Sequence, residues 1–163
     1  MLRTMVISKL AVDSSGKSCV VILKEVDGER SIPIWIGLLE ANAIASELEG
    51  IQFSRPITHD LVKNIMDSID VKVKRVEICD LKNNTYFGLI HISHNGKEMS
   101  IDARPSDALA LSLRFKAPIY VAEKVLKEFM QIKLKGESED NSHQGKKWLE
   151  ILENMDPEDF GNT

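Results

Sequence analysis

The sequence has little cysteine, few aromatic residues and no long hydrophobic run, and each shortage argues against a class of protein. It holds 2 cysteines in 163 residues. Neither lies in a Cys-x-x-Cys motif, so we expect free thiols rather than a zinc site or a disulfide framework. Aromatic residues form 6% of the chain and make no stacking pattern for nucleic-acid bases. Without an apolar stretch of membrane-spanning length or a signal peptide, we expect a cytoplasmic protein that does not bind membranes.

Acidic residues outnumber basic ones. The chain has 21 Lys and Arg against 25 Asp and Glu, a net charge of −4. Proteins that bind nucleic acid non-specifically usually carry a strong basic excess, so this balance argues against that class while leaving room for a local basic site. Lys72, Lys74 and Arg75 lie close together, and we interpret them as the solvated face of a strand.

What is present is a domain-length chain with alternating apolar residues and clear turn signals. Asn95-Gly96 predicts a tight hairpin, and Asp27-Gly28 a second one. The predicted strands cover 3–12, 17–26, 30–36, 71–80, 85–93, 97–103 and 118–121. The predicted helices cover 41–48, 58–69, 106–115 and 123–130. We therefore expect an α+β fold in which mixed or antiparallel meandering sheet segments pack with about four helices.

Two β-β-β-α-like units follow one another at a spacing of 67 residues, which aligns Glu40 with Asp107. The similarity indicates either a duplication or the ordinary preference for an acid in the first turn of a helix. Residues 1–130 are predicted to form the α+β domain. Residues 131–163 are predicted to form a mobile acidic linker and a short C-terminal helix.

The stretch from Asp102 to Asp107 places two carboxylates and a guanidinium where a strand leads into a helix. Pro105 and Ser106 suit a helix start. Arg104 does not, because a cation there lies at the positive end of the helix dipole. Such an arginine needs a carboxylate partner or an anion, and Asp102, two residues away on the same strand face, is the expected partner.

A second Arg-Pro segment, at Arg55, leads into the helix predicted to begin with Thr58 as N-cap. Together the two segments predict a phosphodiester-hydrolysing site, because carboxylates can hold a divalent metal such as magnesium and arginine can bind phosphate with two hydrogen bonds. The candidate catalytic residues are His59, Asp60, Asp102 and Asp107. The candidate phosphate-binding residues are Arg55, Arg104, Thr58 and Ser106, with Glu40 as a further acid. The alternative interpretation is structural: each Asp caps a helix, each Arg pairs with a neighbouring Asp, and His59 is exposed.

Several motifs in one order carry a resemblance to a known family: Pro33–Gly37, Arg55–Leu61, Asp102–Leu111 and Ala117–Val121. Together they resemble the bifunctional nuclease (BFN) domain family across residues 3 to 130. The resemblance implies a compact α+β domain, a homo-oligomer with a dimer as the first expectation, and a nuclease acting on RNA and DNA. It supplies no catalytic set to carry over.

Two other functions fit the same residues. One is a non-catalytic oligomeric binding or assembly module, in which the charged residues form an ion-pair network. The other is a sensor for a small anion, because an arginine beside a helix start suits anion binding.

Overall fold

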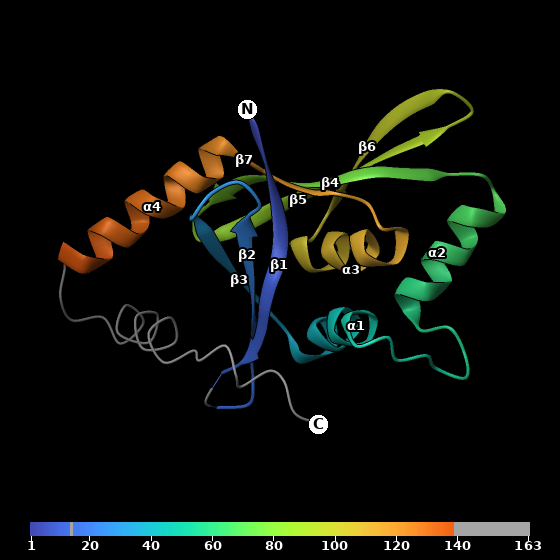
Figure 1. Cartoon of the computed structure of the whole chain (residues 1–163), viewed down its shortest axis with the longest axis horizontal. Coiled ribbons are helices and arrows are strands. Elements are labelled where there is room, and N and C mark those ends of the chain that lie inside the picture. Colours follow the sequence, from blue (N-terminus) through green and yellow to red (C-terminus); the bar gives the residue numbers. More distant parts are fainter. Residues whose placement is uncertain (14, 139–163) are drawn as a thin grey trace. The chain divides into compact units, whose positions relative to one another are not determined.

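The structure is a computed structural model that describes residues 1–13 and 15–138. This part of the chain forms one seven-stranded mixed sheet and four helices, which confirms the α+β class (Figure 1). The strands are β1 (Leu2–Val12), β2 (Cys19–Glu25), β3 (Ser31–Ile36), β4 (Lys72–Lys82), β5 (Thr85–His94), β6 (Lys97–Ala103) and β7 (Ile119–Ala122). The helices are α1 (Leu38–Leu48), α2 (Thr58–Ser68), α3 (Pro105–Phe115) and α4 (Glu123–Ser138).

Two antiparallel meanders run outward from a central strand. The sheet order is β3-β2-β1-β7-β4-β5-β6, and β7 pairs parallel with β4 and antiparallel with β1. Helix α1 follows the first meander and α3 the second, so the β-β-β-α order occurs twice. Leu38 and Pro105 begin these helices 67 positions apart, the spacing seen in the sequence. Glu40 and Asp107 are therefore each the third residue of their helix.

Local sequence explains most of the strand and turn positions. The residues Val20 to Leu23 do not alternate in polarity, and all four are buried, as expected of a strand covered on both faces; β2 lies inside the sheet, between β1 and β3. Pro33 lies on the edge strand β3, where its missing N–H costs no ladder bond. Asn95 and Gly96 have φ of 49° and 76°, as the tightest hairpin turn requires.

The Asp27-Gly28 hairpin forms, but by a different route from the predicted one. Neither residue has positive φ, and the hydrogen bond from Glu25 N–H to the Arg30 carbonyl oxygen closes a wider loop. A Cβ added to Gly28 would collide with the Glu25 carboxylate. A larger residue at position 28 would therefore require the Glu25 side chain to shift.

Helix α3 is the most buried helix, and its packing holds the residues of its first turn in place. Ala108, Leu109 and Ala110 are fully buried. The helix packs against α1, β4 and β5, and Figure 1 shows α1 and α3 side by side.

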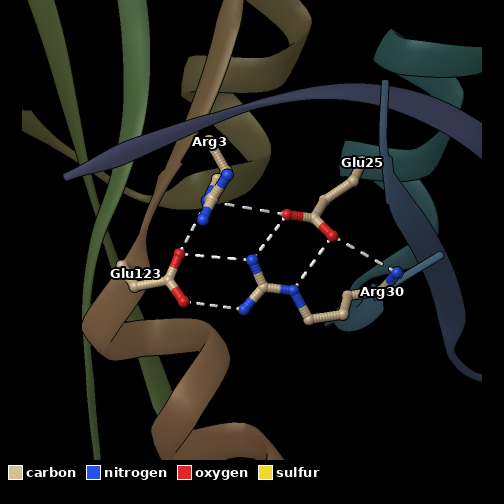
Figure 2. Close-up of polar contacts among 4 residues, drawn as sticks. All are labelled: Arg3, Glu25, Arg30 and Glu123. Atoms are coloured by element: carbon tan, nitrogen blue, oxygen red, sulfur yellow. Dashed lines mark hydrogen bonds and ion pairs between the residues drawn. The ribbon is translucent and has the colours of Figure 1, made fainter. Parts of the chain in front are cut away.

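An ion-pair cluster joins strand ends to the start of α4 (Figure 2). The Arg30 guanidinium donates to Glu25, with Nη2 to Oε1 at 2.6 Å, and to Glu123, with Nη1 to Oε1 at 2.8 Å. Arg3 Nε donates to Glu123 Oε2 at 2.8 Å. The hydrogen bond from Arg30 lowers the pKa of Glu25, and Arg30 with Arg3 lowers the pKa of Glu123 to about 2. We name these four residues the Arg30 clamp.

Two predicted helix features differ from the structure. Thr58 is the first residue of α2 and not its N-cap, which is Ile57, so the prediction of a Thr58 cap was wrong. The spacing of Leu61, Val62, Ile65, Met66 and Ile69 predicts an apolar stripe along this helix. Three of these side chains are exposed all the same: Leu61, Ile65 and Ile69 are 51%, 52% and 54% exposed.

Helix α4 runs to Ser138, beyond the predicted end near Met130. Met1–Leu126 form one compact unit, and a second unit begins at Lys127. The rest of the predicted linker and the predicted C-terminal helix lie in 139–163, outside the described residues. Within the described ranges, no helix is both long and apolar enough to cross a membrane.

Candidate functional site

The start of α3 has an arginine at the N-cap position and proline at the first helical position. Arg104 Nε and Nη2 donate to the two carboxylate oxygens of Asp107, at 2.8 and 3.2 Å, and Nη1 donates to Glu40 Oε1 at 2.9 Å. The predicted ion pair between Arg104 and Asp102 was therefore wrong. Strand alternation ends at Ala103, so the rule that places residues two apart on one face does not extend to Arg104.

His59, in the first turn of α2, joins the same group. Its Nε2 lies 3.0 Å from Asp107 Oδ1, and its side chain is only 15% exposed, so the interpretation of His59 as an exposed residue was wrong. We name Glu40, His59, Arg104 and Asp107 the helix-start cluster, because they come from the first turns of α1 and α2 and from the N-cap and first turn of α3.

The electrostatics of this cluster keep Asp107 ionised. Partial burial favours the neutral acid, but the hydrogen bonds from Arg104 and His59 outweigh it and lower the pKa of Asp107. The hydrogen bonds that Arg104 donates to Asp107 and Glu40 raise the pKa of Arg104. The Arg104 side chain remains 65% exposed, so this cation faces solvent while its carboxylate partners are largely covered.

Asp60 makes separate contacts. Its Oδ1 accepts from Arg114 Nε at 2.7 Å and its Oδ2 accepts from the Ile57 N–H at 3.2 Å. Burial opposes ionisation, but the bond from Arg114 outweighs it and lowers the pKa of Asp60. Arg114 Nη1 also donates to the carbonyl oxygens of Ala43 and Ala110. The Asp60 carboxylate thus holds α2 against α1 and α3.

Sequence reasoning missed Arg114. The residue lies on the buried side of α3 and is 7% exposed. A buried arginine requires partners for its charge and its N–H groups. Its place in an otherwise apolar helix was the available signal, but its partners lie in two other helices.

The structure does not bring the remaining candidates into the helix-start cluster. Arg55, Thr58 and Asp102 are exposed, and within the described residues none bonds to a cluster side chain. Ser106 is 6% exposed, so its hydroxyl does not face solvent at the helix start. No group of three or more metal-ligating side chains occurs in the part of the chain that the structure describes. Cys19 and Cys79 are both free, as expected, although Cys79 is only partly buried.

Chemically, the helix-start cluster combines an imidazole held by a carboxylate with an exposed guanidinium. The first is the usual arrangement of a general acid or base, and the second can neutralise an anion. Arg104 has five N–H donors and uses three of them on Asp107 and Glu40, so two remain for a ligand.

Comparison with known proteins identifies relatives of two kinds. An uncharacterized protein of Mycobacterium tuberculosis is 35% identical over 160 residues, covering 94% of this chain and 95% of that protein. Bifunctional nuclease 2 of Arabidopsis thaliana is 29% identical over 105 residues, covering 62% of this chain and 32% of that protein. Bifunctional nuclease 1 of Oryza sativa subsp. indica is 25% identical over 116 residues, covering 69% of this chain and 35% of that protein.

The chain thus spans about a third of the length of these plant nucleases and nearly all of the bacterial relative. The family model of the bifunctional nuclease domain matches residues 21–133, which include both meanders from β2 onward and the whole helix-start cluster. The chain belongs to the bifunctional nuclease domain family.

Proposed function

We propose that this protein is a nuclease that hydrolyses phosphodiester bonds in RNA or DNA at the helix-start cluster. The observation that carries the proposal is the bond between His59 Nε2 and Asp107, beside the exposed Arg104. Hydrolysis needs a proton acceptor for the attacking water, a proton donor for the leaving oxygen and a cation for the phosphate. The cluster contains residue types suited to all three.

Each residue has a distinct part in this proposal. Asp107 orients the His59 ring, whose Nδ1 has no hydrogen-bond partner among the described residues and is therefore open to exchange a proton. Arg104 uses its two free N–H groups to bind a phosphate oxygen. Glu40 positions the guanidinium from the opposite side.

The family supports the reaction class. The plant relatives carry the name bifunctional nuclease, and the two matches cover 69% and 62% of this chain. The bacterial relative, which matches over nearly its whole length, is uncharacterized. The assignment of nuclease activity to this chain therefore depends on a direct assay.

The test is the rate of cleavage of single-stranded RNA and DNA by highly purified protein, measured with and without a chelator. His59→Ala should lower the rate by about a hundredfold or more, the usual contribution of a positioned acid or base. His94→Ala is the matched control, because it removes a histidine outside the cluster, and it should keep the wild-type rate. Equal rates in His59→Ala and the wild type would refute the proposal, and the chelator arm reports whether a divalent metal takes part.

A second candidate, a homo-oligomeric assembly module, is favoured by the exposed apolar stripe of α2. Leu61, Ile65 and Ile69 together present three large apolar side chains to solvent, and such patches often mark interfaces. In this case light scattering should detect an oligomer, with a dimer as the first expectation, and Ile65→Asp should dissociate it. A wild-type monomer would refute this candidate.

A further inference from the structure

The second meander carries a pocket of about 320 Å³. The polar residues that line it are Lys74, Arg75, His91, Glu98 and Ser100, and the apolar ones are Ile92 and Met99. Arg75 pairs with His91 across β4 and β5, and His91 pairs with Ser100 across β5 and β6. These three residues therefore form one row across three adjacent strands, and their side chains lie on the same face.

A β-bulge places a second positively charged residue beside this row. The register of β4 and β5 shifts between Val73 and Arg75, which leaves Lys74 as the extra residue. The unpaired Lys74 therefore lies next to Arg75 at the bulge, and both residues line the pocket.

Arg75 differs from the arginines of the Arg30 clamp and the helix-start cluster. It is partly buried, its Nε is buried without a hydrogen-bond partner, and it forms no ion pair within the described residues. A buried donor without an acceptor is uncommon in folded proteins and points to a missing partner such as an ion. Among the residues that line the pocket, Lys74 and Arg75 carry two positive charges against the one negative charge of the exposed Glu98. Glu77, which contacts His91 but does not line the pocket, adds a second negative charge nearby.

Hydrogen bonds hold the other two residues of the row, His91 and Ser100, in place. His91 Nε2 lies 3.0 Å from Glu77 Oε2, and Ser100 Oγ lies 2.9 Å from His91 Nδ1. The carboxylate accepts the Nε2–H, which leaves Nδ1 of the neutral ring to accept from the Ser100 hydroxyl. The Ser100 hydroxyl has a single proton, so it donates to a bound anion only by turning away from Nδ1.

We propose that this pocket binds the phosphate group of a phosphate ester. Arg75 and Lys74 supply the charge and Ser100 supplies a hydroxyl, a combination suited to the several acceptor oxygens of phosphate. The volume lies at the lower end of small-molecule sites and leaves room for a group of nucleotide size attached to the phosphate. The site shares no residue with the helix-start cluster, so it does not depend on the proposed nuclease activity.

The test is calorimetric titration of the full chain with inorganic phosphate, adenosine monophosphate, adenosine, and a short RNA strand without terminal phosphates. We expect saturable binding of the monophosphate and none of adenosine. Arg75→Gln should weaken that binding by about tenfold or more, the usual effect of losing a charged hydrogen bond. The RNA strand distinguishes the source of the phosphate: because RNA would also bind the proposed nuclease site, only RNA binding that Arg75→Gln weakens shows that the pocket accepts an internal phosphodiester.

The matched control is Lys72→Gln, which removes one exposed positive charge from the same strand but not from the pocket. It should change the affinity by less than about twofold. Ser100→Ala, at an exposed position where misfolding is not expected, should weaken binding several-fold and so keeps the test informative if Arg75→Gln misfolds. The proposal is overturned if no phosphate-bearing probe saturates, if adenosine binds as well, or if Lys72→Gln weakens binding as much as Arg75→Gln. His59→Ala should bind the monophosphate normally, which separates this test from that of nuclease activity.

Discussion

The Arg30 clamp and the helix-start cluster use similar side chains but differ in charge balance and exposure. The clamp has two arginines and two glutamates, and Glu25 is 8% exposed. The helix-start cluster has two carboxylates, one arginine and one histidine, and Arg104 is 65% exposed. Arg30 uses four N–H donors on its partners, whereas Arg104 uses three.

This difference teaches how to separate a structural ion-pair group from a candidate site. A balanced group in which a carboxylate is buried has little capacity left for a ligand, and removing one partner leaves a charge without compensation. Removing an exposed cation that has free donors costs the protein little stability, yet such a cation can bind an anion. The clamp fits the first description and the helix-start cluster the second.

The largest expected loss of stability comes from Glu25→Ala. This change removes the buried partner of Arg30 and should lower the free energy of unfolding by about 3 kcal/mol, the lower end of values for a broken buried pair. Urea denaturation measures the loss. Glu29→Ala is the matched control, because Glu29 is 95% exposed and, among the described residues, forms an ion pair only with Lys24, at 3.4 Å. It should cost less than about 0.5 kcal/mol. Equal losses in the two variants would remove the distinction between a buried and an exposed pair.

A smaller loss of stability is expected when the pH is lowered. The pKa of Glu123 falls from its ordinary value of 4.5 to about 2 in the folded chain. A lowered pKa stabilises the fold fully above the unfolded value, and this contribution is lost as the pH falls from 4.5 towards 2. Melting temperatures across that range should decline, and Glu123→Gln should decline less steeply than the wild type. Identical slopes would show that the clamp does not govern acid stability.

Most of the fold could be predicted because its signals are local. Strand alternation and the Asn95-Gly96 turn each depend on neighbours in the sequence, and the 67-residue spacing is visible as a repeat along the chain. The insertion of β7 between β1 and β4 could not be predicted, because strand order depends on pairing between distant segments.

The candidate site was predicted in residue type but not in pairing. The sequence identified His59, Arg104, Asp107 and Glu40, yet it paired Arg104 with Asp102 by strand periodicity. The partners lie in α1 and α3, and Glu40 is 64 residues away from Arg104. From the sequence, Lys74 and Arg75 were interpreted as part of the solvated face of a strand. The pocket beside them could not be predicted, because the bulge and the cross-strand row depend on pairing with other strands.

The smallest expected change in stability comes from Arg104→Ala. Because Arg104 is 65% exposed, its loss should change the free energy of unfolding by less than about 1 kcal/mol, although it leaves Asp107 and Glu40 without their cation. The same variant should lower the rate of RNA or DNA cleavage by about a hundredfold, because the phosphate loses its positioned donors. Arg104→Lys keeps the charge but not the two-pronged geometry, so it should recover only part of the rate. A loss of stability as large as that of Glu25→Ala, with an unchanged cleavage rate, would make the helix-start cluster a second structural clamp and would favour the assembly module over the nuclease.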